Sequence, residues 1–272
     1  MTDGSQRSLT LGGIGARLEL RLSGSRVDEL ESQLRLLWER CLDPVSGVDA
    51  GSIGVTLADP EAETDTPLRG ADDLASPDLD LLLLRTTQTI TGRLIKARVG
   101  EVLMFHAGAV CHPVTGASLV FVAEGGTGKT TLARKLARHY GYLTDETVAI
   151  TAENRILPYP KPLSMRQHGE TAKREVAPSD LVEVPDGVEP WVARVVLLDR
   201  DDEHGHQPAI EALGLLDAIA ALAPETSSLH ALPRGLHRCA DLIGATGPVL
   251  RVRYSEATSL TPLFTELIGE AS

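Results

Sequence analysis

Eight consecutive residues carry the clearest chemical signal in the sequence. Residues 123–130 read Ala-Glu-Gly-Gly-Thr-Gly-Lys-Thr, which fits the pattern Gly-x-x-x-x-Gly-Lys-Ser/Thr except that Ala123 replaces the first glycine. Glycines let a loop curl until backbone N–H groups converge on phosphate oxygens, and a helix that starts there adds unpaired donors and its dipole. In such a loop Lys129 bridges the β- and γ-phosphates and the Thr130 hydroxyl is a ligand of Mg²⁺. The residues predicted to bind ATP are Glu124, Gly125, Gly126, Thr127, Gly128, Lys129, Thr130 and Thr131.

Two acidic segments compete for the role of the carboxylates that face this loop. Asp145 and Glu146 follow Lys129 by 16 and 17 residues, and a strand of two or three residues would bring them beside the loop as acids on the Mg²⁺ side. Asp199 is the alternative, because four apolar residues followed by Asp are typical of the metal-side strand of ATPases. Asp199 is also interpreted as a turn residue, since residues 200–208 have the composition of a polar hairpin tip.

The segments around the loop predict an α/β core. Two apolar runs, residues 102–110 and 117–122, are predicted strands separated by a turn at residues 113–116, and the second leads into the loop. Apolar residues at helical spacing follow the loop, and we expect Gly141 to end that helix. Further predicted elements are strands at 148–151, 155–157, 194–198 and 249–253 and helices at 213–223 and 258–268.

The first 98 residues have a different pattern of apolar and polar residues. Their predicted elements are a strand over 17–22, a helix over 27–42, a strand over 53–57, an acidic proline-containing loop over 58–77 and a helix over 78–97. We therefore expect an accessory α/β domain over residues 1–98 and a catalytic domain over residues 99–272.

Composition narrows the class of protein. The chain of 272 residues is 42% hydrophobic and 24% charged, which is ordinary globular composition. Its net charge of −12 argues against nonspecific binding to nucleic acid or to anionic membranes. Three widely spaced cysteines fit neither a disulfide framework nor a zinc site, and the first residues do not read as a signal peptide. We therefore expect a cytoplasmic protein without a membrane span.

Four segments, in this order, resemble the catalytic domain of the HPr kinase/phosphorylase family and its smaller relatives. They are Phe-His-Ala-Gly-Ala-Val at 105–110, the loop at 123–131, Gly-Tyr-Leu-Thr-Asp-Glu at 141–146 and Tyr-Pro-Lys-Pro-Leu-Ser at 159–164. The resemblance is sharp from residue 102 to about residue 166. It implies the phosphoenolpyruvate-carboxykinase-like form of the phosphate-loop fold, with a mixed sheet and helices. It also implies phosphoryl transfer from ATP to a hydroxyl.

The resemblance also implies roles for single residues. Asp145 corresponds to the acid that acts as base toward the hydroxyl or helps to hold Mg²⁺, and Glu146 replaces the family's second Asp. His106 corresponds to a histidine near the phosphates. Lys161 and Arg166 are candidate cations on the acceptor or phosphate side, with solvated surface charge as the alternative.

The sequence departs from the family in ways that bear on the acceptor. It lacks the carboxy-terminal signature that HPr kinases use for phosphorolysis and partner contact, and its acidic pair is Asp-Glu. We therefore expect a serine-type hydroxyl of a ribosomal peptide or a small molecule as acceptor, rather than HPr, and no reverse reaction. Two alternatives stay open: a regulator that binds nucleotide without transfer, and an ATPase that uses Asp199. The family further implies a homo-oligomer, without assigning interface residues.

Overall fold

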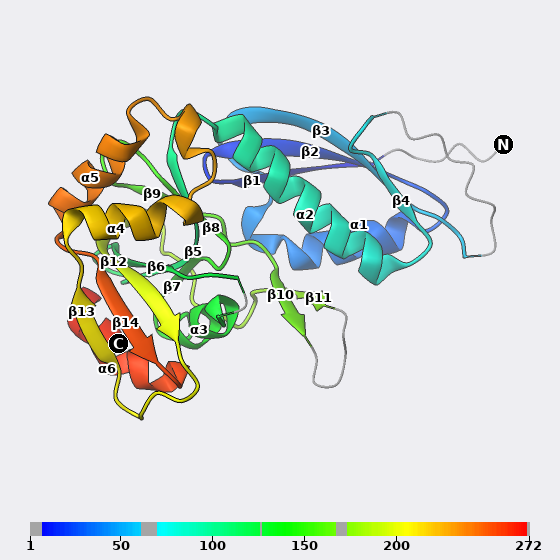
Figure 1. Cartoon of the computed structure of the whole chain (residues 1–272). Helices are drawn as coiled ribbons and strands as arrows, with labels where there is room; N and C mark the ends of the chain where they lie inside the picture. The colour runs from blue at the N-terminus through cyan, green and yellow to red at the C-terminus, as the bar shows by residue number, and fades with distance from the viewer. Residues whose placement is uncertain (1–6, 61–69, 126, 167–172, 271–272) are drawn as a thin grey trace. The chain divides into compact units, whose positions relative to one another are not determined.

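The computed structural model describes residues 7–60, 70–125, 127–166 and 173–270. The chain divides into two units (Figure 1). Unit 1 comprises Met1–Arg98 and Pro160–Ser179, and unit 2 comprises Val99–Tyr159 and Asp180–Ser272. The first boundary coincides with the change in the pattern of apolar and polar residues after residue 98.

Unit 1 contains a four-stranded sheet in the order β1-β2-β3-β4. Strand β1 is antiparallel to β2, whereas β2, β3 and β4 are mutually parallel. Its elements are β1 (Arg7–Gly13), β2 (Ala16–Ser23), α1 (Val27–Leu37), the 3₁₀ turn η1 (Glu39–Cys41), β3 (Val48–Leu57), β4 (Leu74–Ser76), α2 (Leu79–Arg98) and the separate hairpin of β10 (Leu163–Arg166) and β11 (Lys173–Val176). The hairpin groups with unit 1, although the sequence assigns it to the second half, because β11 packs against α2.

The sheet of unit 1 is apolar on one face and polar on the other. In β2 the side chains of Leu18, Leu20 and Leu22 are buried, while those of Arg17 and Glu19 are exposed. This strict alternation is typical of a half-buried strand, and it confirms the strand predicted over 17–22. Both α1 and α2 contact β2 and β3.

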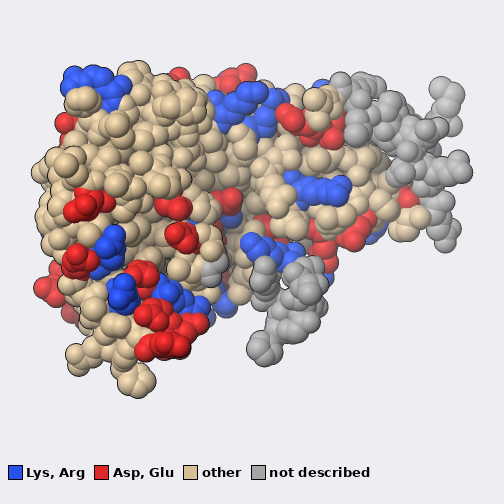
Figure 2. Space-filling view, viewed as in Figure 1, with Lys and Arg blue, Asp and Glu red and all other residues tan. Residues whose placement is uncertain are grey.

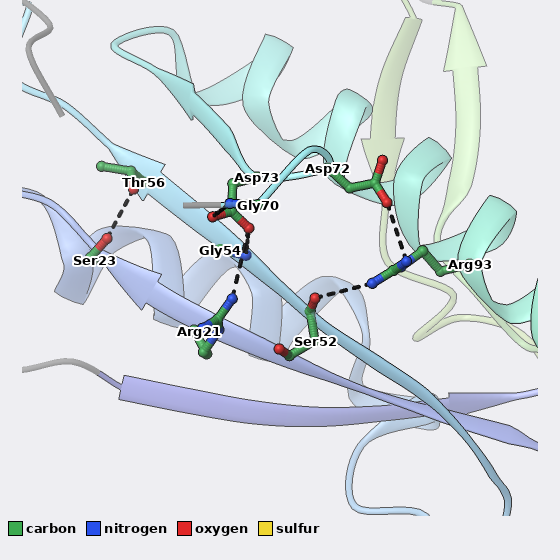
Figure 3. Close-up of polar contacts among 9 residues, drawn as sticks. All are labelled: Arg21, Ser23, Ser52, Gly54, Thr56, Gly70, Asp72, Asp73 and Arg93. Carbon is green, nitrogen blue, oxygen red and sulfur yellow. Dashed lines mark hydrogen bonds and ion pairs between the residues drawn. The ribbon is translucent and has the colours of Figure 1, made fainter. Parts of the chain in front are cut away.

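A polar network fastens the segment before β4 to the sheet (Figure 3). The Asp73 carboxylate accepts hydrogen bonds from the backbone N–H groups of Gly54 and Gly70, at 2.6 and 2.7 Å, and lies 3.8 Å from the Arg21 guanidinium. The Arg93 guanidinium lies 3.3 Å from Asp72 and donates to the Ser52 carbonyl oxygen. The region predicted as a loop over 58–77 thus contains a short strand, and residues 61–69 of it lie outside the described residues.

Unit 2 contains an eight-stranded mixed sheet in the order β13-β14-β12-β6-β5-β8-β9, with β7 paired to β5. Strands β6, β12 and β14 are parallel, and the other pairings are antiparallel. Its strands are β5 (Leu103–Cys111), β6 (Ala117–Val122), β7 (Gly141–Thr144), β8 (Thr147–Ile150), β9 (Ile156–Leu157), β12 (Trp191–Arg200), β13 (Ala209–Ala212) and β14 (Leu250–Tyr254). Its helices and 3₁₀ turns are α3 (Lys129–Leu136), α4 (Leu215–Leu222), η2 (Ala223–Glu225), η3 (Leu229–Ala231), α5 (Gly235–Thr246), η4 (Ala257–Leu260) and α6 (Thr261–Ile268).

Helices cover both faces of this sheet (Figure 1). Helices α4 and α5 pack on one face, where Ala218, Leu222 and Leu242 join a core cluster with Phe105 and Val122. Helices α3 and α6 contact β5, β6, β7 and β12 from the other face. Because both faces are covered, β5 and β6 read as continuous apolar runs, as the sequence predicted.

Two expectations about unit 2 are corrected, and one helix is added. Residues 201–208 do not form a hairpin tip, because β13 pairs with β14 and not with β12. Helix α3 ends at Leu136, and Gly141 is the first residue of β7 rather than a helix stop. A Cβ at Gly141 would lie 2.8 Å from the Cys111 sulfur, so glycine is needed there for packing. Helix α5 was not predicted from the sequence.

The mixed sheets and the helices confirm the predicted α/β class. All three cysteines carry buried, unpaired thiols, in keeping with their spacing. Within the described part of the chain, no helix combines the length and apolar character needed to cross a membrane.

Candidate functional site

The glycine-rich loop, residues 123–128, joins the carboxyl end of β6 to the first turn of α3. All six residues of β6 are buried, and the strand lies between β5 and β12. Gly128 precedes α3 with φ +94°, a left-handed conformation that favours glycine. A Cβ at Gly125 or Gly128 would meet no heavy atom within 4 Å, so open space lies beside the loop backbone. The loop therefore leaves room for a ligand against backbone and against the amino end of a helix.

Lys129 folds back into this loop. Its side chain is buried, and Nζ donates hydrogen bonds to the carbonyl oxygens of Ala123 and Glu124, the latter at 3.1 Å. Burial lowers the pKa of Lys129, and the charges of Glu225, Asp145 and Glu146 oppose that shift. An anionic ligand at the loop would compensate the same buried ammonium group.

The other predicted residues of the loop differ in their surroundings. Thr130 is partly buried in the first turn of α3, whereas Thr131 and the side chain of Glu124 are exposed. The Thr127 hydroxyl donates to the Glu124 carbonyl oxygen, which tightens the loop. Gly126 lies outside the described residues.

Asp145 and Glu146 form the turn between β7 and β8, which we call the acid turn. The short strand β7 leads into it, as the sequence predicted. Asp145 is only 5% exposed, and its Oδ1 accepts a hydrogen bond from the Tyr142 hydroxyl at 3.1 Å. The Thr144 hydroxyl accepts hydrogen bonds from the backbone N–H groups of Glu146 and Thr147 at 3.2 and 3.3 Å. A hydroxyl thus contacts the side chain of Asp145, and another hydroxyl contacts the backbone of the acid turn.

His106 lies beside the acid turn. It is the single exposed residue of β5 and is paired in register with Thr147. The next residue, Ala107, donates its N–H to the Glu146 carbonyl oxygen at 3.1 Å. Strand pairing therefore places the backbone of His106 next to that of the acid turn, a neighbourhood that the spacing alone did not predict.

Glu225 acts on Lys129 through its charge and Tyr254 contacts the loop, and the sequence did not point to either residue. Thr226 forms an isolated bridge with Phe105, so η2 brings Glu225 alongside β5, and its carboxylate is the foremost charge acting on Lys129. The Tyr254 hydroxyl, at the end of β14, donates to the Thr127 carbonyl oxygen at 3.3 Å. Burial raises the pKa of Tyr254, so its hydroxyl stays protonated. No local pattern marks either residue, because only tertiary pairing brings them to the loop.

Asp199 has a partner away from the loop. It lies opposite Arg253 in β14, and their side chains form an ion pair at 3.0 Å. The next residue, Arg200, lies opposite Tyr254, whose hydroxyl reaches the loop. Successive side chains of a strand point to opposite faces, so Asp199 points away from the face on which Tyr254 contacts the loop.

The two candidate cations after β9 belong to unit 1. Lys161 is 1% exposed and donates to the Pro162 carbonyl oxygen at 2.9 Å, so the interpretation as a solvated surface charge is wrong for this residue. Its charge acts on the buried thiol of Cys41. Arg166 ends β10, where it is paired in register with Lys173.

The described side chains suit Mg²⁺ bound together with phosphates better than a metal held by protein alone. Among the described residues, no three His, Cys, Asp or Glu side chains converge on one point. Mg²⁺ usually binds through one or two protein oxygens plus phosphates and waters. Thr130, Asp145 and Glu146 offer oxygen donors of that kind.

Comparisons with known proteins give little further guidance. No protein-family model matches the chain, and no curated protein matches it. Among solved structures, the Hpr(Ser) kinase/phosphatase from Coxiella burnetii shares 12% identity with it, with a TM-score of 0.31. That match covers 61% of this chain and 93% of the other. A TM-score of this size gives no basis for transferring a site or an activity.

Proposed function

We propose that the protein is an ATP-dependent kinase that transfers the γ-phosphoryl group to a hydroxyl of a peptide serine or of a small molecule. The observation that carries the proposal is the loop between β6 and α3, onto which the buried Lys129 folds back, together with the contact of α3 with β7, the strand that leads to the buried Asp145. Lys129 starts α3 directly after the glycine-rich loop, and Asp145 in the acid turn is near enough for its charge to act on Lys129. Phosphoryl transfer needs positioned charges more than covalent chemistry, and this pair supplies one charge of each sign.

Each residue has a defined task in the proposed reaction. The loop N–H groups and Lys129 bind the phosphates and offset their charge. Asp145 accepts the proton of the acceptor hydroxyl. At the same time the hydroxyl oxygen bonds to the γ-phosphorus, and the bond between the γ-phosphorus and the leaving ADP oxygen breaks. Thr130, Asp145 and Glu146 would hold Mg²⁺, which supplies further charge neutralisation when bound. His106 is exposed beside the acid turn and is available to phosphate or acceptor.

The same proposal assigns the fold more finely. Unit 2 would be a phosphate-loop core of the phosphoenolpyruvate-carboxykinase-like type, and unit 1 an accessory domain in a cytoplasmic, homo-oligomeric protein. Neither nucleic acid nor membrane is a proposed partner. The net charge of −12 supports this, and on the face shown in Figure 2 basic side chains lie among acidic ones.

Transfer of label from [γ-³²P]ATP tests the proposal. Purified protein is incubated with Mg-ATP, with and without a pool of hydroxyl metabolites and peptides, and Lys129→Ala serves as the blank. We expect labelled acceptor with the wild type and none with the variant. Equal ADP release with and without the pool would indicate an ATPase, and ATP binding without turnover would indicate a regulator; either result would refute the kinase.

A further inference from the structure

Tyr142 belongs to no motif in the sequence, yet its hydroxyl contacts the acid at the centre of the proposed reaction. We propose that Tyr142 is a positioning residue that fixes the carboxylate of Asp145 toward the acceptor hydroxyl. The inference rests on the proposed kinase function and deepens it, because it names what holds the base in place.

An irregularity in β7 lies between Tyr142 and Asp145, the residue that directly follows this strand. In the pairing of β5 with β7, Val110 lies opposite Tyr142 and Ala109 lies opposite Thr144, so one extra residue, Leu143, is inserted in β7. In a regular strand, side chains three positions apart point to opposite faces. The inserted residue shifts this alternation, and bulges of this kind re-aim side chains next to functional sites. Leu143 itself packs into the apolar core.

Tyr142 contacts the side chain of Asp145, whereas other groups contact the backbone of the acid turn. The Thr144 hydroxyl and the Ala107 N–H bind the backbone of the acid turn, whereas the Tyr142 hydroxyl binds the Oδ1 atom of Asp145. Both partners are buried, with Tyr142 at 1% and Asp145 at 5% exposed. A hydrogen bond from a neutral hydroxyl to a carboxylate is stronger than one between neutral groups. The contact therefore restricts rotation of the carboxylate.

The charged groups around Asp145 come from several elements. Glu146 adjoins it in the acid turn, and the charges of Asp145, Glu146 and Glu225 in η2 all act on Lys129 at the start of α3. His106 lies in the neighbouring strand β5. With charges of both signs acting in this region, the position of the carboxylate decides whether it can accept the proton of the acceptor hydroxyl.

Removing one hydroxyl tests the inference. Tyr142→Phe keeps the buried ring and deletes the hydrogen bond to Asp145. Tyr140→Phe is the matched control, because Tyr140 is also buried and donates to the Gly269 carbonyl oxygen at 2.9 Å, away from the acid turn. We would measure kcat and the KM for Mg-ATP for the wild type and both variants, and for Asp145→Asn with and without Tyr142→Phe.

We expect Tyr142→Phe to lower kcat about 10-fold or more, with the KM for Mg-ATP near the wild-type value. Tyr140→Phe should keep the wild-type kcat. In the Asp145→Asn background, Tyr142→Phe should cause no further loss, because its effect passes through that carboxylate. Equal kcat for Tyr142→Phe and Tyr140→Phe, or a full loss on top of Asp145→Asn, would overturn the inference while leaving the kinase standing. A wild type no more active than Lys129→Ala would refute the proposed function itself.

Discussion

The sheets of the two units bury their strands differently, and polar residues have different tasks in them. In unit 1 only one face is apolar, and the polar side chains around Asp73 fasten the sheet to the segment before β4 (Figure 3). In unit 2 both faces are covered, and polar groups gather at the carboxyl end of β6 and in the acid turn. Burying a polar group costs free energy unless the group is paired, which makes the buried Lys129 and Asp145 candidates for a function. In unit 1 the same residue types serve stability.

Removing a cation from each unit should separate chemistry from structure most strongly. Lys129→Ala removes the buried ammonium group beside the loop, and we expect a loss of transfer of about 100-fold or more. Arg93→Ala removes the guanidinium that contacts Asp72 and Ser52 in unit 1, and the protein should keep its turnover. A comparable loss of transfer in Arg93→Ala at unchanged folding would show that the two sheets do not divide their tasks in this way.

The same substitution at a strand glycine should affect the two sheets unequally. A Cβ at Gly108 in β5 would lie 2.1 Å from the Phe121 ring, whose position is fixed by the buried core, and we expect Gly108→Ala to lower the free energy of unfolding by about 3 kcal/mol. A Cβ at Gly54 in β3 would lie closest to the Asp73 carboxylate, at 2.9 Å, and Gly54→Ala should cost about 1 kcal/mol. Urea unfolding followed by circular dichroism measures both. The comparison fails if Gly54→Ala proves the more damaging change.

Two aspartates compare the stability contributed by a carboxylate that backbone N–H groups bind with that contributed by an exposed ion pair. Asp73 is bound by two backbone N–H groups and its side chain is 10% exposed, so Asp73→Ala should lower the free energy of unfolding by about 1–2 kcal/mol. Asp199 has an exposed partner, Arg253, and Asp199→Ala should cost no more than about 0.5 kcal/mol. Thermal unfolding of both variants measures the two losses of stability. A larger loss for Asp199→Ala than for Asp73→Ala would contradict this prediction.

The smallest expected effect is a pH dependence of folding stability that is caused by Lys129. Burial lowers its pKa below the ordinary 10.5, so between the lowered pKa and 10.5 the unfolded chain binds more protons than the folded chain. The stability of the wild type relative to Lys129→Met should therefore rise as pH increases through that window and stay constant below it. Urea unfolding of both proteins from neutral pH to about 10.5 measures the difference. A difference that falls with pH would contradict the burial of the ammonium group.

Much of the fold was predictable where burial imposes a simple period. The apolar runs of β5 and β6 and the long helical pattern of α2 come through with boundaries shifted by about one residue. Strand β13 was missed because all four of its residues are exposed and carry no alternation. Helix α5 was missed because Gly235 and Gly244 weaken its local preference, and tertiary packing of Leu242 and its neighbours supplies the stability instead.

Only part of the candidate site could be predicted from the sequence. The glycine-rich loop is contiguous in sequence, so its type and place could be predicted from the chain alone. Tyr142, Glu225 and Tyr254 could not, since a bulge, a backbone bridge and a parallel strand pairing bring them to the loop and the acid turn. Contacts of this kind depend on strand register, which no local motif encodes.

The choice between Asp145 and Asp199 tests the central claim most directly. We would measure transfer of the γ-phosphoryl group and the Kd for Mg-ATP for Asp145→Asn and Asp199→Asn side by side. The proposed mechanism predicts that Asp145→Asn loses transfer by about 100-fold or more while its Kd stays close to that of the wild type, and that Asp199→Asn keeps both. Transfer at the wild-type rate by Asp145→Asn, or its loss in Asp199→Asn alone, would contradict the claim that the acid turn carries the chemistry.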